Sequence, residues 1–184
     1  DPDAWIGNNR ISNVVGYCPS DPARYGAVVT LDDRRDNATK PNGEMIVSGV
    51  RAQVSADYLA DPATTGVQVV STYGHGANTA KRNWDKAVYS DIQATTLTGV
   101  GASVHASISG VKSLVWGNSN LTTGVMATPP SLASVIVSRC DDVTFGSGFN
   151  LVGRSLAGAM QVDYFDKLTF LDASIRGGGA DDSA

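Results

Sequence analysis

Two aspartates, Asp141 and Asp166, occupy the same place in two copies of a sequence repeat, 25 positions apart (166−141). If successive copies stack as neighbouring strands, equivalent residues lie about 5 Å apart. That distance is close to the separation of about 5 to 5.5 Å between the two carboxyl groups of a retaining glycosidase. Asp163 belongs to the same acidic patch, which Asp172 extends. The pattern therefore identifies Asp141, Asp166 and Asp163 as candidate catalytic carboxylates for glycoside cleavage.

The same residues also have a purely structural interpretation. Lys112 stands one repeat before Asp141, and Lys167 follows Asp166 directly, so lysines can neutralise the two carboxylates. Like charges that face each other unscreened in a sheet cost a few tenths to about 1 kcal/mol. A solvated charge ladder is the simplest interpretation, and a cation or sugar contact and a catalytic pair remain as alternatives.

A second group of candidates lies in the segment from Tyr73 to Trp84, which has neither a helical nor a strand period. Long irregular loops on a regular scaffold are common ligand sites. Trp84 and Tyr73 could offer aromatic faces to a sugar, and His75 lies between two glycines. With Asp172 they form the predicted glycan-binding set. Only two histidines are present, so we expect no histidine-rich metal site and no cofactor.

These residues are positioned by a repeat of short strands rich in Val, Thr and aromatic residues and interrupted by Gly, Asn and Asp. Its period of 22 to 29 residues is typical of a solenoid. Two inward ladders are expected, one of Leu114, Val143 and Leu168 and one of Trp116, Phe145 and Phe170.

One segment conflicts with strict alternation. Val162, Tyr164 and Phe165 cannot all point inward, so a bulge or corner must intervene or one aromatic must face outward.

The composition limits the function classes. The chain has 184 residues, of which 42% are hydrophobic and 17% charged, with a net charge of −4, so it is long enough for one domain with a continuous core. No basic run exceeds Arg34-Arg35, which argues against nucleic-acid binding. No apolar run reaches the length of a membrane helix, so no membrane partner is expected. Cys140 occupies an inward position and is predicted to be a small buried hydrophobe rather than a nucleophile or half of a disulfide with Cys18.

The spacing of turn residues divides the chain into three parts. Residues 1–86 are expected to form irregular N-terminal coils and loops, with strands at 27–31 and 45–54 and a short helical turn within 55–65. Residues 87–177 form the regular coils, and 178–184 are predicted to be a disordered tail or linker.

Over residues 87–177 the repeat resembles the right-handed parallel β-helix of the pectin-lyase-like superfamily, most of all the shaft of a bacteriophage tailspike or tail fibre. The resemblance implies an all-β solenoid, a homotrimer with outward Val115 and Val137 covered by neighbouring chains, and contacts with other virion tail proteins. It also implies a virion or otherwise extracellular location and recognition of host cell-surface polysaccharide.

Three functions follow as hypotheses. The leading one is a structural tail component that binds surface polysaccharide. A polysaccharide depolymerase, either a hydrolase or a lyase, would need the acidic residues to converge on one cleft. A bacterial surface adhesin would be a monomer with an exposed outer face. The fold alone cannot choose among them.

Overall fold

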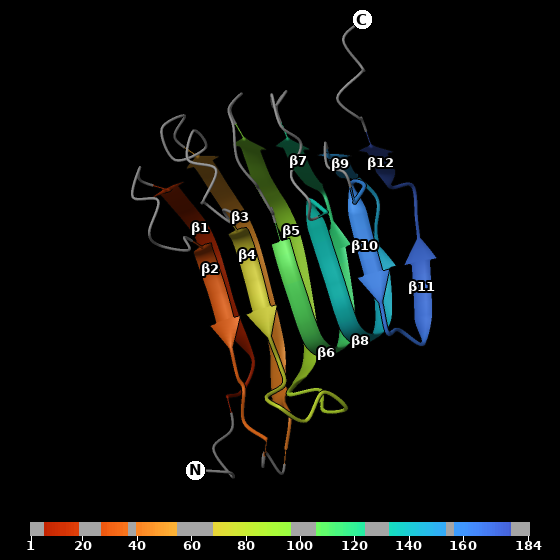
Figure 1. Ribbon diagram of the computed structural model, residues 1–184. Coiled ribbons are helices and arrows are strands. Elements are labelled where there is room, and N and C mark those ends of the chain that lie inside the picture. Colours follow the sequence, from red (N-terminus) through yellow and green to blue (C-terminus); the bar gives the residue numbers. More distant parts are fainter. Residues whose placement is uncertain are drawn as a thin grey trace, which may run out of the picture.

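The computed structural model describes residues 6–18, 27–36, 40–54, 68–96, 106–123, 133–153 and 157–177. Within these ranges the protein is all-β, with twelve strands joined into one sheet by parallel pairs and no helix (Figure 1). The described residues accordingly contain no helix long and apolar enough to cross a membrane.

The strands are, in chain order, β1 (Asn9–Cys18), β2 (Ala27–Asp32), β3 (Asn42–Val54), β4 (Gln68–Tyr73), β5 (Trp84–Thr96), β6 (Ala106–Gly117), β7 (Ser119–Thr123), β8 (Val135–Phe145), β9 (Phe149–Gly153), β10 (Met160–Asp163), β11 (Lys167–Phe170) and β12 (Ser174–Gly177).

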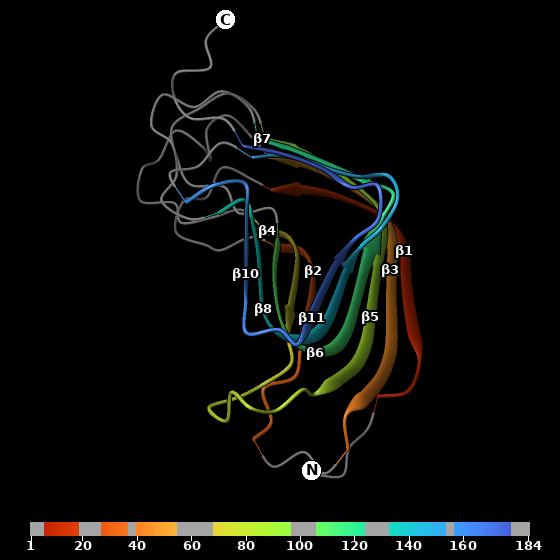
Figure 2. The ribbon, with the colours of Figure 1, turned by 90° about the vertical axis from the view of Figure 1, so that its right-hand side faces the viewer.

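Parallel pairing arranges the strands on three faces, which the chain visits in a constant order. Face 1 contains the first halves of β1, β3 and β5, the second halves of β6 and β8, and β11. Face 2 contains the second halves of β1, β3 and β5, followed by β7, β9 and β12. Face 3 contains β2, β4, the first halves of β6 and β8, and β10. Figure 2 shows the three faces as the sides of a triangular outline.

The core consists of side chains that stack along these faces. Both predicted ladders are confirmed, because Leu114, Val143 and Leu168 are register partners, as are Trp116, Phe145 and Phe170. Tyr89 extends the aromatic ladder, with ring centroids 5.3 Å from Trp116. Along the rest of the ladder the centroids lie 6.5 Å apart for Trp116 and Phe145 and 5.4 Å apart for Phe145 and Phe170. Such contacts add about 0.5 to 1.5 kcal/mol to the area that each ring buries.

Each pass of the chain over the three faces forms one layer, and the last layer leaves several of its large apolar residues exposed. Phe145 is fully buried, whereas Phe170, its partner in β11, is 48% exposed. The predicted irregularity between 160 and 165 is a corner at Tyr164, which has a φ of 55° and is 72% exposed. Phe165 is also exposed, so the side chains of both aromatics of this segment remain outside the core.

The columns extend further toward the N-terminus than the repeat predicted. Asn9, Met45 and Ala87 are successive register partners, so face 1 continues through residue 86 without interruption. The predicted strands at 27–31 and 45–54 are present as β2 and β3. The helical turn within 55–65 and the tail 178–184 lie outside the described residues.

The expected direction of Val137 is wrong. Val137 is fully buried, in register with Ile108 and Val162 on the inner side of face 3. Arg139 turns the chain between face 3 and face 1, and this corner resets the alternation of side-chain direction. Strict alternation from inward Cys140, three positions later, therefore assigns Val137 to the wrong side. Val115 is half-buried and remains the outward residue of the two.

Single residues with positive φ make the tight corners. Between face 1 and face 2 they are Asn13, Gly49, Asp91, Asn118, Gly148 and Asp172. Between face 3 and face 1 they are Gly110, Arg139 and Tyr164. Gly110 also packs against Gly74 of the preceding layer, and a Cβ on Gly110 would lie 2.2 Å from the Gly74 carbonyl carbon.

Gly110→Ala is therefore predicted to lower the free energy of unfolding by about 3 kcal/mol or more. The methyl group would add a backbone clash to the left-handed penalty of about 1 to 2 kcal/mol. Gly158→Ala is the matched control, since Gly158 also has a positive φ but a Cβ on it would meet no atom within 4 Å. Urea unfolding of both variants measures the difference, and equal losses would refute the close approach at Gly110.

Candidate functional site

The first two corners between face 3 and face 1 are loops rather than single-residue turns. Residues 33–36 follow β2, residues 40–41 precede β3, and residues 74–83 connect β4 to β5. Both loops leave the same corner in successive layers, since Asp32 and Tyr73 are register partners at the ends of β2 and β4. In Figure 2 they lie at the lower end of the molecule.

These two loops enclose an open cleft of about 610 Å³ lined by Arg34, Tyr73, His75, Gly76 and Ala77. Tyr73 and His75 were both predicted as glycan contacts, and the structure brings them together. Gly76 lets the loops approach closely, because a Cβ at this position would lie 2.2 Å from the Arg34 carbonyl oxygen.

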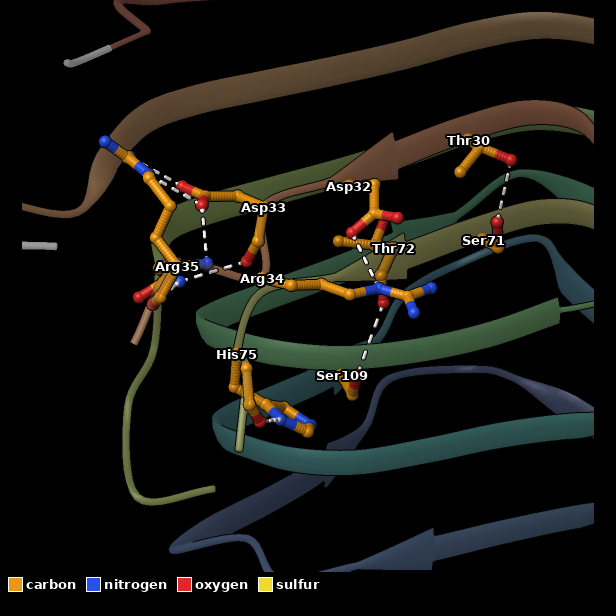
Figure 3. Close-up of polar contacts among 11 residues, drawn as sticks. Thr30, Asp32, Asp33, Arg34, Arg35, Ser71, Thr72, His75 and Ser109 are labelled. Carbon is orange, nitrogen blue, oxygen red and sulfur yellow. Dashed lines mark hydrogen bonds and ion pairs between the residues drawn. The ribbon is translucent and has the colours of Figure 1, made fainter. Parts of the chain in front are cut away.

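Arg34 covers one face of the tyrosine ring. Its Cζ atom lies 4.6 Å from the Tyr73 ring centroid, within the range of a cation–π contact. Its Nε donates a 2.9 Å hydrogen bond to Asp32 Oδ1 (Figure 3). Among the described residues, the two terminal nitrogens of Arg34 have no hydrogen-bond partner. The planar edge between them is therefore available to a ligand.

His75 is held by its own loop. Its Nδ1 lies 2.9 Å from the Gly76 carbonyl oxygen (Figure 3). Because a carbonyl oxygen only accepts hydrogen bonds, Nδ1 carries the proton, and Nε2 of the neutral ring is an acceptor. The described residues give Nε2 no partner, so it can accept a hydrogen bond from a ligand hydroxyl.

A largely buried polar network links the segments that carry the cleft. Asp33 receives two hydrogen bonds from the Arg35 guanidinium, 2.8 Å from Nε and 2.7 Å from Nη2, and one of 2.6 Å from Asn42. Asn83 donates from its side chain to the carbonyl oxygens of Asp33 at 3.0 Å and Arg35 at 2.9 Å. These bonds fix the two loops relative to each other.

The ionised form of Asp33 is stabilised by this network. Burial, the largest influence, acts to raise the pKa of Asp33. Hydrogen bonds from the Arg35 side chain and backbone and from Asn42 together outweigh it, so the pKa lies below its usual value. Asp33 is 7% exposed, and its two oxygens are satisfied by partners that a neutral carboxyl would bond less well.

Trp84 does not reach the cleft. It is 2% exposed and points into the core as the first residue of β5, in register with Val111 of β6. Sequence reasoning assigned it to the loop surface, but the strand begins at this residue and turns its side chain inward. Its indole Nε1 has no hydrogen-bond partner among the described residues.

Asp172 lies at another corner. Its positive φ places it between face 1 and face 2 in the last layer, where Ser147 Oγ lies 3.3 Å from Asp172 Oδ2. Of the four predicted glycan contacts, the cleft therefore contains Tyr73 and His75.

The predicted catalytic carboxylates are partly brought together. The Asp166 amide donates a 2.9 Å hydrogen bond to the Asp141 carbonyl oxygen, so these residues are neighbours in adjacent layers as predicted. Asp141 Oδ1 accepts a 2.7 Å hydrogen bond from Arg82 Nε. Asp163 lies across the Tyr164 corner on face 3, where Gln161 donates a 2.5 Å hydrogen bond to it.

The carboxylates on face 1 are neutralised by other partners than the sequence predicted. Lys112 binds Asp85 at 2.6 Å, and Arg82 of the cleft loop takes the place beside Asp141. This arrangement corresponds to a charge ladder on face 1.

Cys140 is inaccessible. It is fully buried and free, as predicted for a small hydrophobe, and burial raises the pKa of its thiol to about 12. The described residues contain no group of three or more His, Cys, Asp or Glu side chains arranged to hold a metal ion.

Sequence reasoning missed Arg34 and Asp33. The run Asp32-Asp-Arg-Arg-Asp36 has the composition of a solvated turn, and that interpretation hides the buried carboxylate. The position of this run could have identified the site, because the run and the irregular segment after Tyr73 each follow a strand of face 3.

Comparison of the chain with protein-family models, curated proteins and solved structures found no match.

Asp33→Asn should lower the free energy of unfolding by about 1.5 to 3 kcal/mol near neutral pH, because a charged acceptor is replaced in a buried network. The loss should be constant above the ordinary aspartate pKa of about 3.9 and should shrink as the pH falls through the lower pKa of folded Asp33. Urea unfolding of both proteins between pH 2.5 and 7 measures this loss of unfolding free energy. Asp85→Asn, in an exposed pair with Lys112, is the control and should cost less than about 1 kcal/mol. A pH-independent loss for Asp33→Asn would contradict the assignment.

Proposed function

We propose that this chain is a segment of a right-handed parallel β-helix that binds a cell-surface polysaccharide through the cleft at its loop corner. Three features support the architecture: parallel pairing throughout the described strands, a constant order of three faces, and columns of equivalent side chains from Asn9 to Leu168. In such a scaffold each layer covers the edge of the previous one, which leaves corner loops free to vary.

The observation that carries the binding proposal is the convergence of Tyr73, His75 and Arg34 on one open cleft of about 610 Å³. Its groups match the chemistry of a glycan, since Arg34 offers donors, the imidazole offers an acceptor and the aromatic ring offers apolar surface. The Asp33 network pre-organises the loops, which reduces the entropy lost on binding.

Further parts of the proposal rest on the resemblance of the repeat to phage tailspikes. They are a homotrimer, contacts with other virion tail proteins, and a location on the virion or otherwise outside the cell. A bacterial adhesin built on the same scaffold is the alternative, and it would be monomeric.

A depolymerase is the second candidate function, favoured by the adjacency of Asp141 and Asp166 in neighbouring layers. The ion pair of Asp141 with Arg82 favours the binding function, because it occupies one of the two carboxylates that cleavage would require.

The test is a panel of bacterial capsular and O-antigen polysaccharides, assayed for both binding and release of reducing ends. Binding without cleavage is expected, and His75→Ala should weaken it about tenfold by removing an acceptor from the cleft. Asp172→Asn, at a different corner, is the control and should bind normally.

Failure to bind any glycan, or equal binding by the His75 variant, would contradict the proposal. Cleavage that disappears in an Asp141→Asn, Asp166→Asn double variant would instead support the depolymerase.

A further inference from the structure

One face of the Tyr73 ring is not open to a stacking sugar. Arg34 occupies this face, with its Cζ atom 4.6 Å from the ring centroid, and the Arg34 Nε donates a hydrogen bond to Asp32. A pyranose could stack on that face only by displacing the guanidinium and breaking this contact. The group that the cleft presents to a ligand there is the free edge of Arg34.

This edge has a specific chemical preference. Nη1 and Nη2 of a guanidinium present parallel N–H donors in one plane, which match the two oxygens of a carboxylate or phosphate. Asp32 holds the opposite end of the group through Nε, so the guanidinium is oriented before a ligand arrives. Stacking on Tyr73 fixes the plane, and ordering costs little on binding.

His75 supplies the second contact. Its Nε2 is an acceptor and cannot bind an oxyanion in the neutral ring, but it can accept from a hydroxyl group. A sugar that carries an acidic substituent beside a free hydroxyl satisfies both residues, with the oxyanion at Arg34 and the hydroxyl at His75.

We propose that the cleft selects anionic glycans and recognises an oxyanion substituent through the free edge of Arg34, with His75 accepting a neighbouring sugar hydroxyl. This proposal rests on the proposed glycan-binding function and specifies its ligand class. The oxyanion is either the carboxylate of a uronic acid or the phosphate of a phosphorylated sugar.

The first experiment uses three sugars that differ only at C6: D-glucose, D-glucuronate and D-glucose 6-phosphate. Imidazole NMR signals of His75 are followed during titration, and a His105→Gln variant identifies them, because these are the only two histidines. His75 should shift with glucuronate, glucose 6-phosphate or both, and not with glucose. The response to each acidic sugar identifies the source of the oxyanion. Equal shifts with all three sugars, or none with either acidic sugar, would overturn the proposal.

Arg34→Gln should weaken binding of the responding sugar about tenfold or more, since it removes a charge-assisted pair. Arg51→Gln is the matched control, because Arg51 is also an exposed arginine paired with an aspartate, Asp91, but lies on face 2. Unchanged affinity in Arg34→Gln, or an equal loss in Arg51→Gln, would contradict the role of Arg34.

A second experiment distinguishes the preference for anionic glycans from glycan binding itself. The polysaccharide that binds best is tested again after chemical reduction of its carboxyl groups or enzymatic removal of its phosphates. A loss of binding of about tenfold is expected. Retained binding that still depends on His75 would overturn the anionic preference and leave the glycan-binding function intact. If no polysaccharide binds at all, the glycan-binding function itself fails.

Discussion

The structure depends on tight corners in which a residue with positive φ turns the chain from one face to the next. Six positive-φ residues from Asn13 to Asp172 turn face 1 into face 2. Because each corner uses the same backbone conformation, each pass of the chain meets the previous one in register, and side chains of one type accumulate in columns. The aromatic column from Tyr89 to Phe170 is a consequence of this alignment. Asn and Asp tolerate the left-handed conformation better than other side chains, which explains their frequency at these positions.

The candidate site arises where this constraint is relaxed. Between face 3 and face 1 the later layers turn at Gly110, Arg139 and Tyr164, whereas the first two layers insert loops. A loop has backbone groups that the regular strand pairing leaves unpaired. The Asp33 side chain accepts a hydrogen bond from the Arg35 amide, and the Asn83 side chain donates to the carbonyl oxygens of Asp33 and Arg35. The same network holds Asp33 and Arg35, the two chain neighbours of Arg34, in place at the cleft. The regular columns form the scaffold, and the irregular corner carries the candidate site.

Whether a contact could be predicted from the sequence depends on how many positions separate its two register partners along the chain. The ladder from Leu114 to Leu168 could be predicted because its layers differ by only 29 and 25 positions and share turn residues. Asp32 and Tyr73 are 41 positions apart (73−32), since the first layers carry longer connections, so the repeat could not align them. Trp84 was misplaced for a related reason, because its direction depends on where β5 begins after an aperiodic loop. The predicted outward direction of Val137 was wrong because a corner at Arg139 resets the alternation between inward and outward side chains.

The most direct test of this account is disulfide trapping of the register on the outer side of face 1. Val115 pairs with Thr144, which pairs with Thr169, so Val115 and Thr169 are two layers apart. In a Cys18→Ser, Cys140→Ala background, Val115→Cys with Thr144→Cys should form a disulfide under mild oxidation, because adjacent strands lie about 4.8 Å apart. Val115→Cys with Thr169→Cys should not, because two layers place the cysteines about 9.6 Å apart, beyond the disulfide limit of about 7 Å. Cross-linking of the distant pair, or failure of the adjacent one, would contradict the in-register stacking on which the cleft depends.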